Sequence, residues 1–167
     1  EQAVRVNAPG AAVVRYESAD GSMRSFSEDN LYGADSNFFD FFAYKLKEGD
    51  PRTALHGLNK IVISDEAAKK FFGDEPALGK FLLVGDQRRA LEVTGVTEPQ
   101  PANSHFRFDY LQSIYTNPAI KRFEWSWVWT QTVTYVKLRP GAQPAAAALW
   151  LLRRPHHRRR WQRHAAD

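Results

Sequence analysis

The stretch from Lys60 to Lys80, KIVISDEAAKKFFGDEPALGK, decides the fold of this chain. Residues 61–63 are β-branched and apolar, which predicts a buried strand. Ser64 follows directly and is a favoured helix N-cap, and Asp65 and Glu66 add the negative charge that stabilises a helix N-terminus. The stretch therefore predicts a strand that leads at once into a helix.

The predicted helix is short and has one apolar face. Gly73 is expected to end it, as glycine often does at a helix C-terminus. Helical spacing places Ala67 beneath Phe71 and Ala68 beneath Phe72. Because a helix of two turns is not stable alone in water, this face must pack against a sheet, and the two phenylalanines are predicted core anchors.

Two β-hairpins are predicted on either side of this unit. In the first, Ala11–Tyr16 pairs with Ser22–Phe26 around an Asp-Gly turn, which is a good hairpin signal. In the second, Phe81–Val84 pairs with Leu91–Val96, and Gly95 marks a bulge. Three more short strands are predicted, at Leu31–Tyr32, Phe106–Tyr110 and Thr130–Leu138. Short strands and short helices in irregular alternation indicate an α+β fold with mixed sheets.

An aromatic cluster follows the first hairpin. Ser36 is expected to cap a turn of helix that carries four phenylalanines, Phe38, Phe39, Phe41 and Phe42. They fill four of five positions, so they cannot all lie on one helix face. Core packing is the favoured interpretation, while Phe38 and Phe41 are candidates for a ligand or partner surface. A second short helix is expected at Pro51–Leu55.

Length and composition limit the possible classes of protein. The 167 residues suffice for one domain or two small subdomains with a sizeable core. The chain starts at Glu1 and its single methionine is Met23, so we expect a fragment of a longer protein. No apolar run has the length of a transmembrane helix, and no signal peptide is evident. The absence of cysteine excludes disulfides and thiol chemistry.

The positive charge of the chain lies in one terminal segment. Residues 151–167 hold six arginines and one aspartate, a formal charge of +5, which leaves −1 of the total +4 for residues 1–150. This tail also holds three of the five histidines. Two interpretations stay open: an arm for an anionic surface or nucleic acid, and non-native sequence such as an out-of-frame reading of a GC-rich gene would give.

No catalytic, metal or nucleotide motif is evident. Ser104, His105 and Asp109 form the one cluster with the residue types of nucleophilic catalysis, but no G-x-S-x-G elbow surrounds them, and a polar loop is the better interpretation. The tail histidines lack metal-site spacing, and no glycine cluster matches a phosphate-binding loop. The pairs at 65–66 and 74–75 are expected to be helix-start and turn carboxylates. We therefore expect no cofactor, no metal and no enzymatic activity.

A row of tryptophans allows a second hypothesis. Trp125, Trp127 and Trp129 would share one face of a strand, where their rings could stack on a sugar or an apolar ligand. The favoured interpretation is that these rings fill the core or a seam between subdomains. A soluble aromatic-lined module for glycans therefore stays open as the alternative function.

Five ordered segments carry a family likeness: ADSNFFDFFAYKLKEGDP, IVISDEAAKKFFGDEPALGK, LEVTGV, PANSHFRFDYL and TYVKLRPGA. In this order and at this spacing the chain resembles the extracytoplasmic core domain of MacB/FtsX-type ABC transporter permeases, most closely the large versions of Bacteroidetes. The likeness covers roughly residues 1–145 and departs at the arginine-rich tail.

The resemblance implies a non-catalytic periplasmic domain, residues 1–150, of an inner-membrane protein. It implies a membrane-proximal lobe from residues 1–26 and 128–152 and a distal lobe from residues 27–127. The implied partners are the membrane-embedded remainder of the permease, a separate cytoplasmic ATPase and a periplasmic protein or lipoprotein, with no nucleic acid. We expect a homodimer in the intact transporter and a monomer for the fragment. The domain would couple ATP hydrolysis to export or to force on a periplasmic partner.

Overall fold

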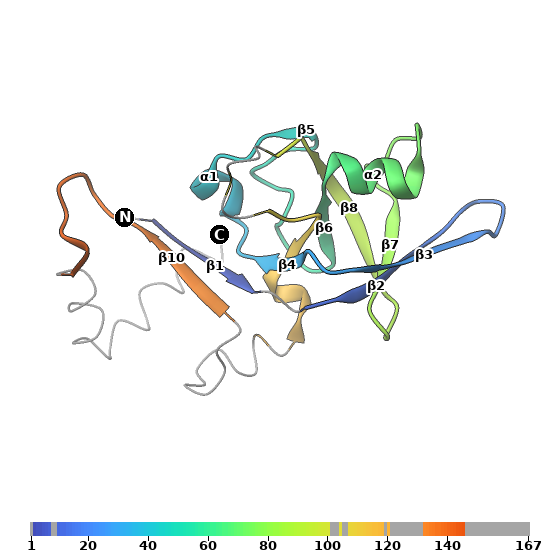
Figure 1. The fold of residues 1–167 in the computed structure, drawn as a ribbon, viewed down its shortest axis with the longest axis horizontal. Coiled ribbons are helices and arrows are strands. Elements are labelled where there is room, and N and C mark those ends of the chain that lie inside the picture. Colours follow the sequence, from blue (N-terminus) through green and yellow to red (C-terminus); the bar gives the residue numbers. More distant parts are fainter. Residues whose placement is uncertain are drawn as a thin grey trace. The chain divides into compact units, whose positions relative to one another are not determined.

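The structure is a computed structural model that describes residues 2–7, 10–100, 104, 107–118, 120 and 132–145 (Figure 1). The chain divides into two compact units, Val4–Tyr135 and Glu1–Ala3 with Val136–Asp167. The smaller unit holds the first residues of β1 and the last residues of β10. All contacts described below lie within the larger unit.

Ten strands, two α-helices and one 3₁₀ turn have both of their ends among the described residues. The strands are β1 (Gln2–Asn7), β2 (Ala12–Glu17), β3 (Met23–Glu28), β4 (Leu31–Ala34), β5 (Leu46–Glu48), β6 (Lys60–Ile63), β7 (Phe81–Val84), β8 (Arg89–Thr97), β9 (Tyr110–Ser113) and β10 (Thr132–Lys137). The helices are α1 (Phe38–Phe42) and α2 (Asp65–Phe72), and the 3₁₀ turn is η1 (Ile114–Thr116). No helix among these is both long and apolar enough to cross a membrane.

The strands form one mixed sheet. Their order is β10-β1-β4-β9-β6-β8-β7-β2-β3, and β5 pairs with β8 outside this path. The pairs β4–β9 and β6–β8 are parallel, whereas β6–β9, β7–β8 and β2–β3 are antiparallel. The α+β class with a mixed sheet is thereby confirmed, and the division into two lobes stays a prediction.

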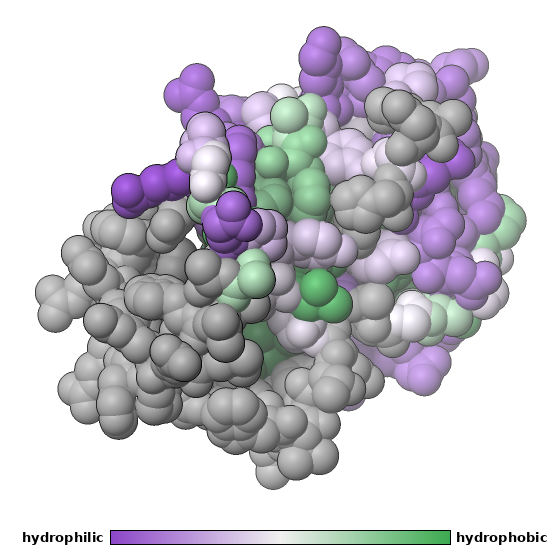
Figure 2. Space-filling view, turned by 60° about the vertical axis from the view of Figure 1, so that its left-hand side comes forward, coloured by the Kyte–Doolittle hydropathy of each residue, from purple (hydrophilic) through white to green (hydrophobic). Residues whose placement is uncertain are grey.

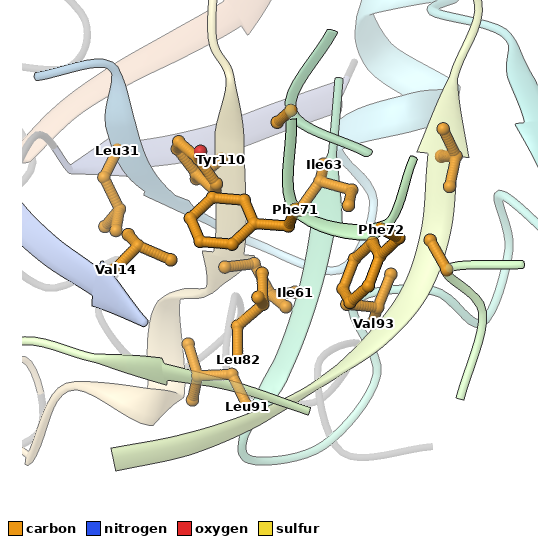
Figure 3. Close-up of a cluster of buried hydrophobic side chains, with 13 residues drawn as sticks. Val14, Leu31, Ile61, Ile63, Phe71, Phe72, Leu82, Leu91, Val93 and Tyr110 are labelled. Carbon is orange, nitrogen blue, oxygen red and sulfur yellow. The ribbon is translucent and has the colours of Figure 1, made fainter. Parts of the chain in front are cut away.

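The strand and helix predicted at the opening stretch are confirmed. The Ser64 side chain accepts a hydrogen bond from the Ala67 amide at 3.1 Å and caps α2. Gly73 ends the helix with its amide bonded to the Lys69 carbonyl. Phe71 is fully buried, and Figure 3 shows its ring at the centre of a cluster of side chains from the sheet. The cluster consists of Val14, Leu31, Ile61, Ile63, Ala67, Phe71, Phe72, Ala77, Leu82, Leu91, Val93, Val96 and Tyr110.

Both predicted hairpins form. β2 and β3 pair over six residues around the turn that contains Gly21, and β7 and β8 pair around residues 85–88. The predicted irregularity at Gly95 is also present, because the register between β6 and β8 skips one residue between Val93 and Gly95. The turn chemistry of the sequence was sufficient for these local pairs.

Three local expectations were wrong in detail. The N-cap of α1 is Asn37 instead of Ser36, because the Phe38 amide already closes a turn on the Asp35 carbonyl. Pro51–Leu55 is a hydrogen-bonded turn and not a helix. Of the strand expected at Phe106–Tyr110, Phe106 lies outside the described residues, and among the others β9 begins only at Tyr110, since the Phe108 amide is bound to a glutamine side chain.

Candidate functional site

The strongest candidate site is an aromatic cluster around α1 with a pocket beside it. Phe38 is its centre: its ring stacks on Tyr44 with a centroid distance of 5.6 Å and contacts Phe42 at 4.9 Å. Phe108 meets Phe38 edge to face at 5.6 Å. Phe42 also contacts Tyr135 at 5.2 Å, so the cluster joins residues far apart in the sequence.

The cluster follows from the way α1 ends. Ala43 has a positive φ of 52°, and its amide bonds to the Phe39 carbonyl. This left-handed residue turns the chain sharply after one and a half turns of helix, so that Tyr44 folds back against Phe38. A longer helix would have carried Tyr44 away from the cluster.

A pocket of about 450 Å³ opens beside these rings. It is lined by Phe42, Ala43, Tyr44, Lys45, Glu98, Pro99, Gln100 and Ser104. Residues 42–45 and 98–100 form two of its walls, and a backbone hydrogen bond joins them: the Glu98 amide donates to the Lys45 carbonyl at 3.1 Å. Tyr44 and Ser104 share a hydrogen bond of 2.7 Å between their hydroxyl groups. Aromatic walls with a few polar groups at the rim are typical of binding pockets.

The wall formed by Gln100 is fixed by its side chain. Its Nε2 donates to the Phe108 carbonyl, and its Oε1 accepts from the Phe108 amide at 3.2 Å. This pair mimics a backbone ladder and holds the loop against the buried Phe108. The pocket wall is therefore anchored to the core.

A second, more open pocket of about 500 Å³ lies near the β6–β8 pair. Lys60 and Glu92 line it and form an ion pair with each other, which neutralises its charge. Thr94, also in its lining, donates its hydroxyl to the Ala54 carbonyl at 2.6 Å. Its polar groups are engaged within the fold, so it is the weaker candidate.

Figure 2 shows apolar residues gathered in a band on the face that this view presents, with hydrophilic residues on either side. Apolar surface of this kind is typical of interaction sites when it is contiguous.

The described part of the chain holds no group of three or more histidines or carboxylates that could bind a metal ion. The described residues of the aromatic pocket offer apolar contact and hydrogen-bonding groups.

The family follows from a match over most of the chain. A family model described as the MacB-like periplasmic core domain matches residues 1–151. The chain belongs to this family. The MacB-like domain is 37% identical over 89 residues to the macrolide export ATP-binding/permease protein MacB of Aggregatibacter actinomycetemcomitans, a match that covers 48% of the chain and 14% of that protein.

Solved structures agree with the membership of this MacB-like domain. A domain of a putative permease protein from Porphyromonas gingivalis superposes with a TM-score of 0.73 at 27% identity, covering all of this chain and 65% of the other. The periplasmic region of MacB from Actinobacillus actinomycetemcomitans gives a TM-score of 0.61 at 22% identity, covering 90% and 64%. The extracellular domain of the transporter YknZ from Gram-positive bacteria gives 0.53 at 20% identity, covering 82% and 65%, and shares the fold.

The predicted resemblance and the periplasmic location of the domain in an inner-membrane transporter are thereby confirmed. The chain is a MacB-like periplasmic domain of an ABC transporter permease. It spans about two thirds of the solved neighbours and a small part of the MacB relative.

The structure places the two predicted phenylalanines differently. Phe38 is fully buried in the MacB-like domain, as core packing requires, whereas Phe41 is partly exposed and contacts Phe42 at 4.8 Å. The predicted tryptophans, Trp125, Trp127 and Trp129, lie outside the described residues. A ligand or partner surface on these five residues stays a prediction.

The polar cluster considered for nucleophilic catalysis is not assembled by its described members. Ser104 bonds to Tyr44, whereas the Asp109 carboxylate accepts from the Ser64 hydroxyl at 3.1 Å and from the Asn30 side-chain Nδ2 at 2.8 Å. His105 and the three tail histidines lie outside the described residues. Asp109 serves the start of α2 by orienting its capping serine.

The carboxylates at the start of α2 are helix-start charges, as expected. Asp65 forms ion pairs with Lys47 at 2.8 Å and with Lys69 at 2.6 Å. The hydrogen bonds from Lys47 and Lys69 hold the pKa of Asp65 below its usual value. The pKa of Lys47 is raised by the same contact.

Apart from Phe42 and Ser104, sequence reasoning missed the residues that line the aromatic pocket. Lys45 and Glu98 meet because β5 pairs with β8, a contact between segments about fifty residues apart. β5 has three residues and no strong periodicity, so the sequence gives no local signal for it. Only the close approach that Gly49 permits could have indicated the pairing.

Proposed function

We propose that this domain is a non-catalytic part of an ABC transporter permease that couples cytoplasmic ATP hydrolysis to export or to force on a periplasmic partner. The observation that carries the proposal is the match of residues 1–151 to the MacB-like periplasmic core domain family. The MacB relative is by its name an ATP-binding and permease protein for macrolide export. The implied partners are the membrane-embedded remainder of the permease and a cytoplasmic ATPase.

The contacts of β1 support a role in transmitting force. The Arg5 guanidinium binds the Asp35 carboxylate through two nitrogen atoms, with distances of 2.9 and 3.0 Å. The same guanidinium donates to the Tyr115 hydroxyl at 2.9 Å, and the Arg5 amide donates to Asp35 at 2.8 Å. We call these three residues the Arg5 clamp. The clamp fixes β1 to the residue directly after β4 and to η1, which follows β9, so a pull on β1 would reach the central sheet.

The chemistry of the described residues supports a non-catalytic role. The carboxylates of Asp65, Glu92 and Asp109 are held by lysine, serine or asparagine partners. The aromatic pocket instead offers a surface for an apolar group.

The test uses the parent permease with its ATPase, reconstituted in proteoliposomes. Arg5→Ala should reduce transport or partner-stimulated ATP hydrolysis while basal hydrolysis persists, because the clamp lies outside any nucleotide site. Arg52→Ala, an exposed arginine of the same domain, is the matched control. Equal coupling in both variants would contradict a role for the clamp. A parent protein without an associated ATPase would overturn the proposed function itself.

A further inference from the structure

The β3 strand leaves one backbone edge open among the described residues. β3 is the last strand in the sheet order and pairs only with β2 within the described part of the chain. Figure 1 shows the β2–β3 hairpin extending beyond α2 and β7. β3 is exposed over nearly its whole length, including Met23 at 46% and Phe26 at 37%. An exposed strand edge is a template for pairing with another strand.

The alternation of hydrogen-bonded and non-hydrogen-bonded pairs between β2 and β3 shows which backbone groups of β3 face outward. The Ser18 amide donates to the Ser22 carbonyl at 2.9 Å, so this pair is hydrogen-bonded. In an antiparallel pair, hydrogen-bonded and non-hydrogen-bonded pairs alternate. On β3 the residues whose backbone groups turn towards β2 are therefore Arg24, Phe26 and Glu28, and those whose groups turn outward are Met23, Ser25 and Ser27.

A backbone hydrogen bond on the other side of β2, towards β7, agrees with this alternation. The Val13 carbonyl accepts from the Gly85 amide at 2.9 Å, so Val13 faces β7. Val13 is paired with Ser27 in the register of the hairpin. Ser27 accordingly directs its amide and carbonyl away from β2, towards the open edge.

The side chains on this edge are self-complementary. The sequence RSFSE, residues 24–28, has Phe26 at its centre, a serine on each side, a positive residue before them and a negative residue after them. An antiparallel copy centred on Phe26 would place Arg24 opposite Glu28 at both ends. Ser25 would then face Ser27, and these are outward-facing residues, as a hydrogen-bonded pair requires.

We propose that β3 pairs antiparallel with β3 of a second copy of this chain, with Phe26 opposite Phe26. The occupant is a second copy because the charges of residues 24–28 complement their own reversed order. The pairing extends the sheet across a two-fold axis, which is the commonest symmetry of soluble oligomers. It does not depend on the proposed function.

The contacts of the two charged residues are compatible with this pairing. Arg24 donates one guanidinium hydrogen bond to the Phe71 carbonyl at 2.7 Å, and a guanidinium has five N–H donors. The Glu28 side chain is 12% exposed and forms an ion pair with Lys70 through one carboxylate oxygen, so a partner arginine would have to approach the carboxylate along the open edge of the strand. Lys70 also lies 4.4 Å above the Phe26 ring. Arg24 and Glu28 are thus held on the same face as Phe26, in the orientation that a cross-strand pair needs.

The association is expected to be weak for the separate domain. Pairing along one strand buries much less surface than a stable dimer interface. When other parts of the same assembly hold two copies close together, their effective concentration reaches the millimolar range for short flexible linkages. A weak contact of this kind is expected to be occupied at about that concentration. The open edge then acts as a second, conditional contact between copies.

The register can be tested with single cysteines, since the natural sequence has none. Phe26→Cys places the two thiols on the two-fold axis, where paired Cα atoms are about 4.5 Å apart, within the range of a disulfide. We expect this variant, oxidised in the 167-residue chain, to form covalent dimer at a much higher rate than Phe81→Cys, a control at a residue that is 55% exposed. Ser25→Cys tests the alternative register in which the partner strand is displaced by two residues, so that Ser25 lies opposite Ser25.

Charge reversal provides a second test. Arg24→Glu alone places like charges opposite each other, and so does Glu28→Arg alone. An equimolar mixture of the two variants restores opposite charges at both ends of the pair. We expect each variant alone to self-associate about tenfold more weakly than the mixture in sedimentation equilibrium.

The outcomes separate the possible occupants. Fast crosslinking of Phe26→Cys together with recovery in the mixture supports the proposal. Equal crosslinking of Phe26→Cys and Phe81→Cys overturns it, and so does faster crosslinking of Ser25→Cys. If Glu28→Arg fails to fold, as its thermal melt would show, the cysteine series alone decides. If a different protein protects β3 amides from hydrogen exchange while Phe26→Cys does not crosslink, the edge serves another partner.

Discussion

A Cβ atom on Gly49 would lie 2.3 Å from the Thr94 carbonyl oxygen and 2.9 Å from the Gly95 Cα atom. Gly49 also has a φ of 93°, in the left-handed region. It follows directly after β5, so the backbone of this segment reaches the bulge of β8 only because position 49 has no side chain. Gly49 and Thr94 both line the more open pocket, so this approach forms one of its walls.

We expect Gly49→Ala to lower the free energy of unfolding by about 3 kcal/mol or more, because strain at φ adds to a backbone clash. Gly57→Ala is the matched control, with a similar φ of 87° but nothing within 4 Å of its Cβ. It should cost about 1–2 kcal/mol. Urea unfolding measures both. Equal losses would mean that the β5–β8 approach relaxes without cost.

Phe71→Ala should destabilise the domain by about 3–5 kcal/mol, because it removes a fully buried ring at the centre of the core. Phe81→Ala is the control, since its ring is 55% exposed, and its cost should stay within about 1 kcal/mol. Chemical denaturation gives both values. An unchanged melting temperature of Phe71→Ala would show that α2 is peripheral to the stability of the domain.

The Arg5 clamp should also be visible in stability. Arg5 and Asp35 are 25% and 18% exposed, so loss of the guanidinium leaves a mostly buried carboxylate with fewer partners. We expect Arg5→Ala to cost about 2 kcal/mol, and Arg5→Lys to recover little of it because lysine cannot bind the carboxylate with two nitrogens. Arg52→Ala should be near neutral. Full recovery by Arg5→Lys would indicate a purely electrostatic contact.

The start of α2 should make stability depend on pH in the acid range. The pKa of Asp65 is lower in the folded chain than in the unfolded one, so its stabilising contribution is complete above about pH 5 and is lost as the pH falls through the folded-state pKa. Asp65→Asn should therefore lower the melting temperature at neutral pH and converge with the natural chain in acid. Glu66→Gln, in the same turn of helix, controls for the helix dipole. A difference that persists unchanged in acid would contradict the ion-pair origin.

The local parts of the fold could be predicted from sequence because their signals lie within a few residues. The Ser64 cap and the stop at Gly73 depend on adjacent side chains, as do the two hairpin turns. The position of β9 could not be predicted in this way. Tyr110 and Leu111 are both buried because β9 lies between β4 and β6, whereas the sequence pattern placed the strand earlier, at Phe106–Tyr110.

The aromatic site was predicted only in part. The phenylalanines of α1 were evident, but the roles of Phe38 and Tyr44 depend on the left-handed Ala43, a conformation that alanine rarely adopts. Gln100 could not be recognised because its contact with Phe108 replaces backbone pairing with a side chain. The conformation of Ala43 and the contact of Gln100 both depend on the packing of the folded chain, which local sequence does not specify.

The strand order has a consequence for the way this chain is made. β4 lies next to β9, yet about eighty residues separate them, and β6 bridges β9 and β8. During synthesis from the N-terminus, the first four strands therefore emerge well before the segment that completes the centre of the sheet. Non-local pairing of this kind is slow to form. We expect the nascent chain to acquire native protection late and all at once, after residue 113 is available, with the β2–β3 hairpin as its earliest ordered part.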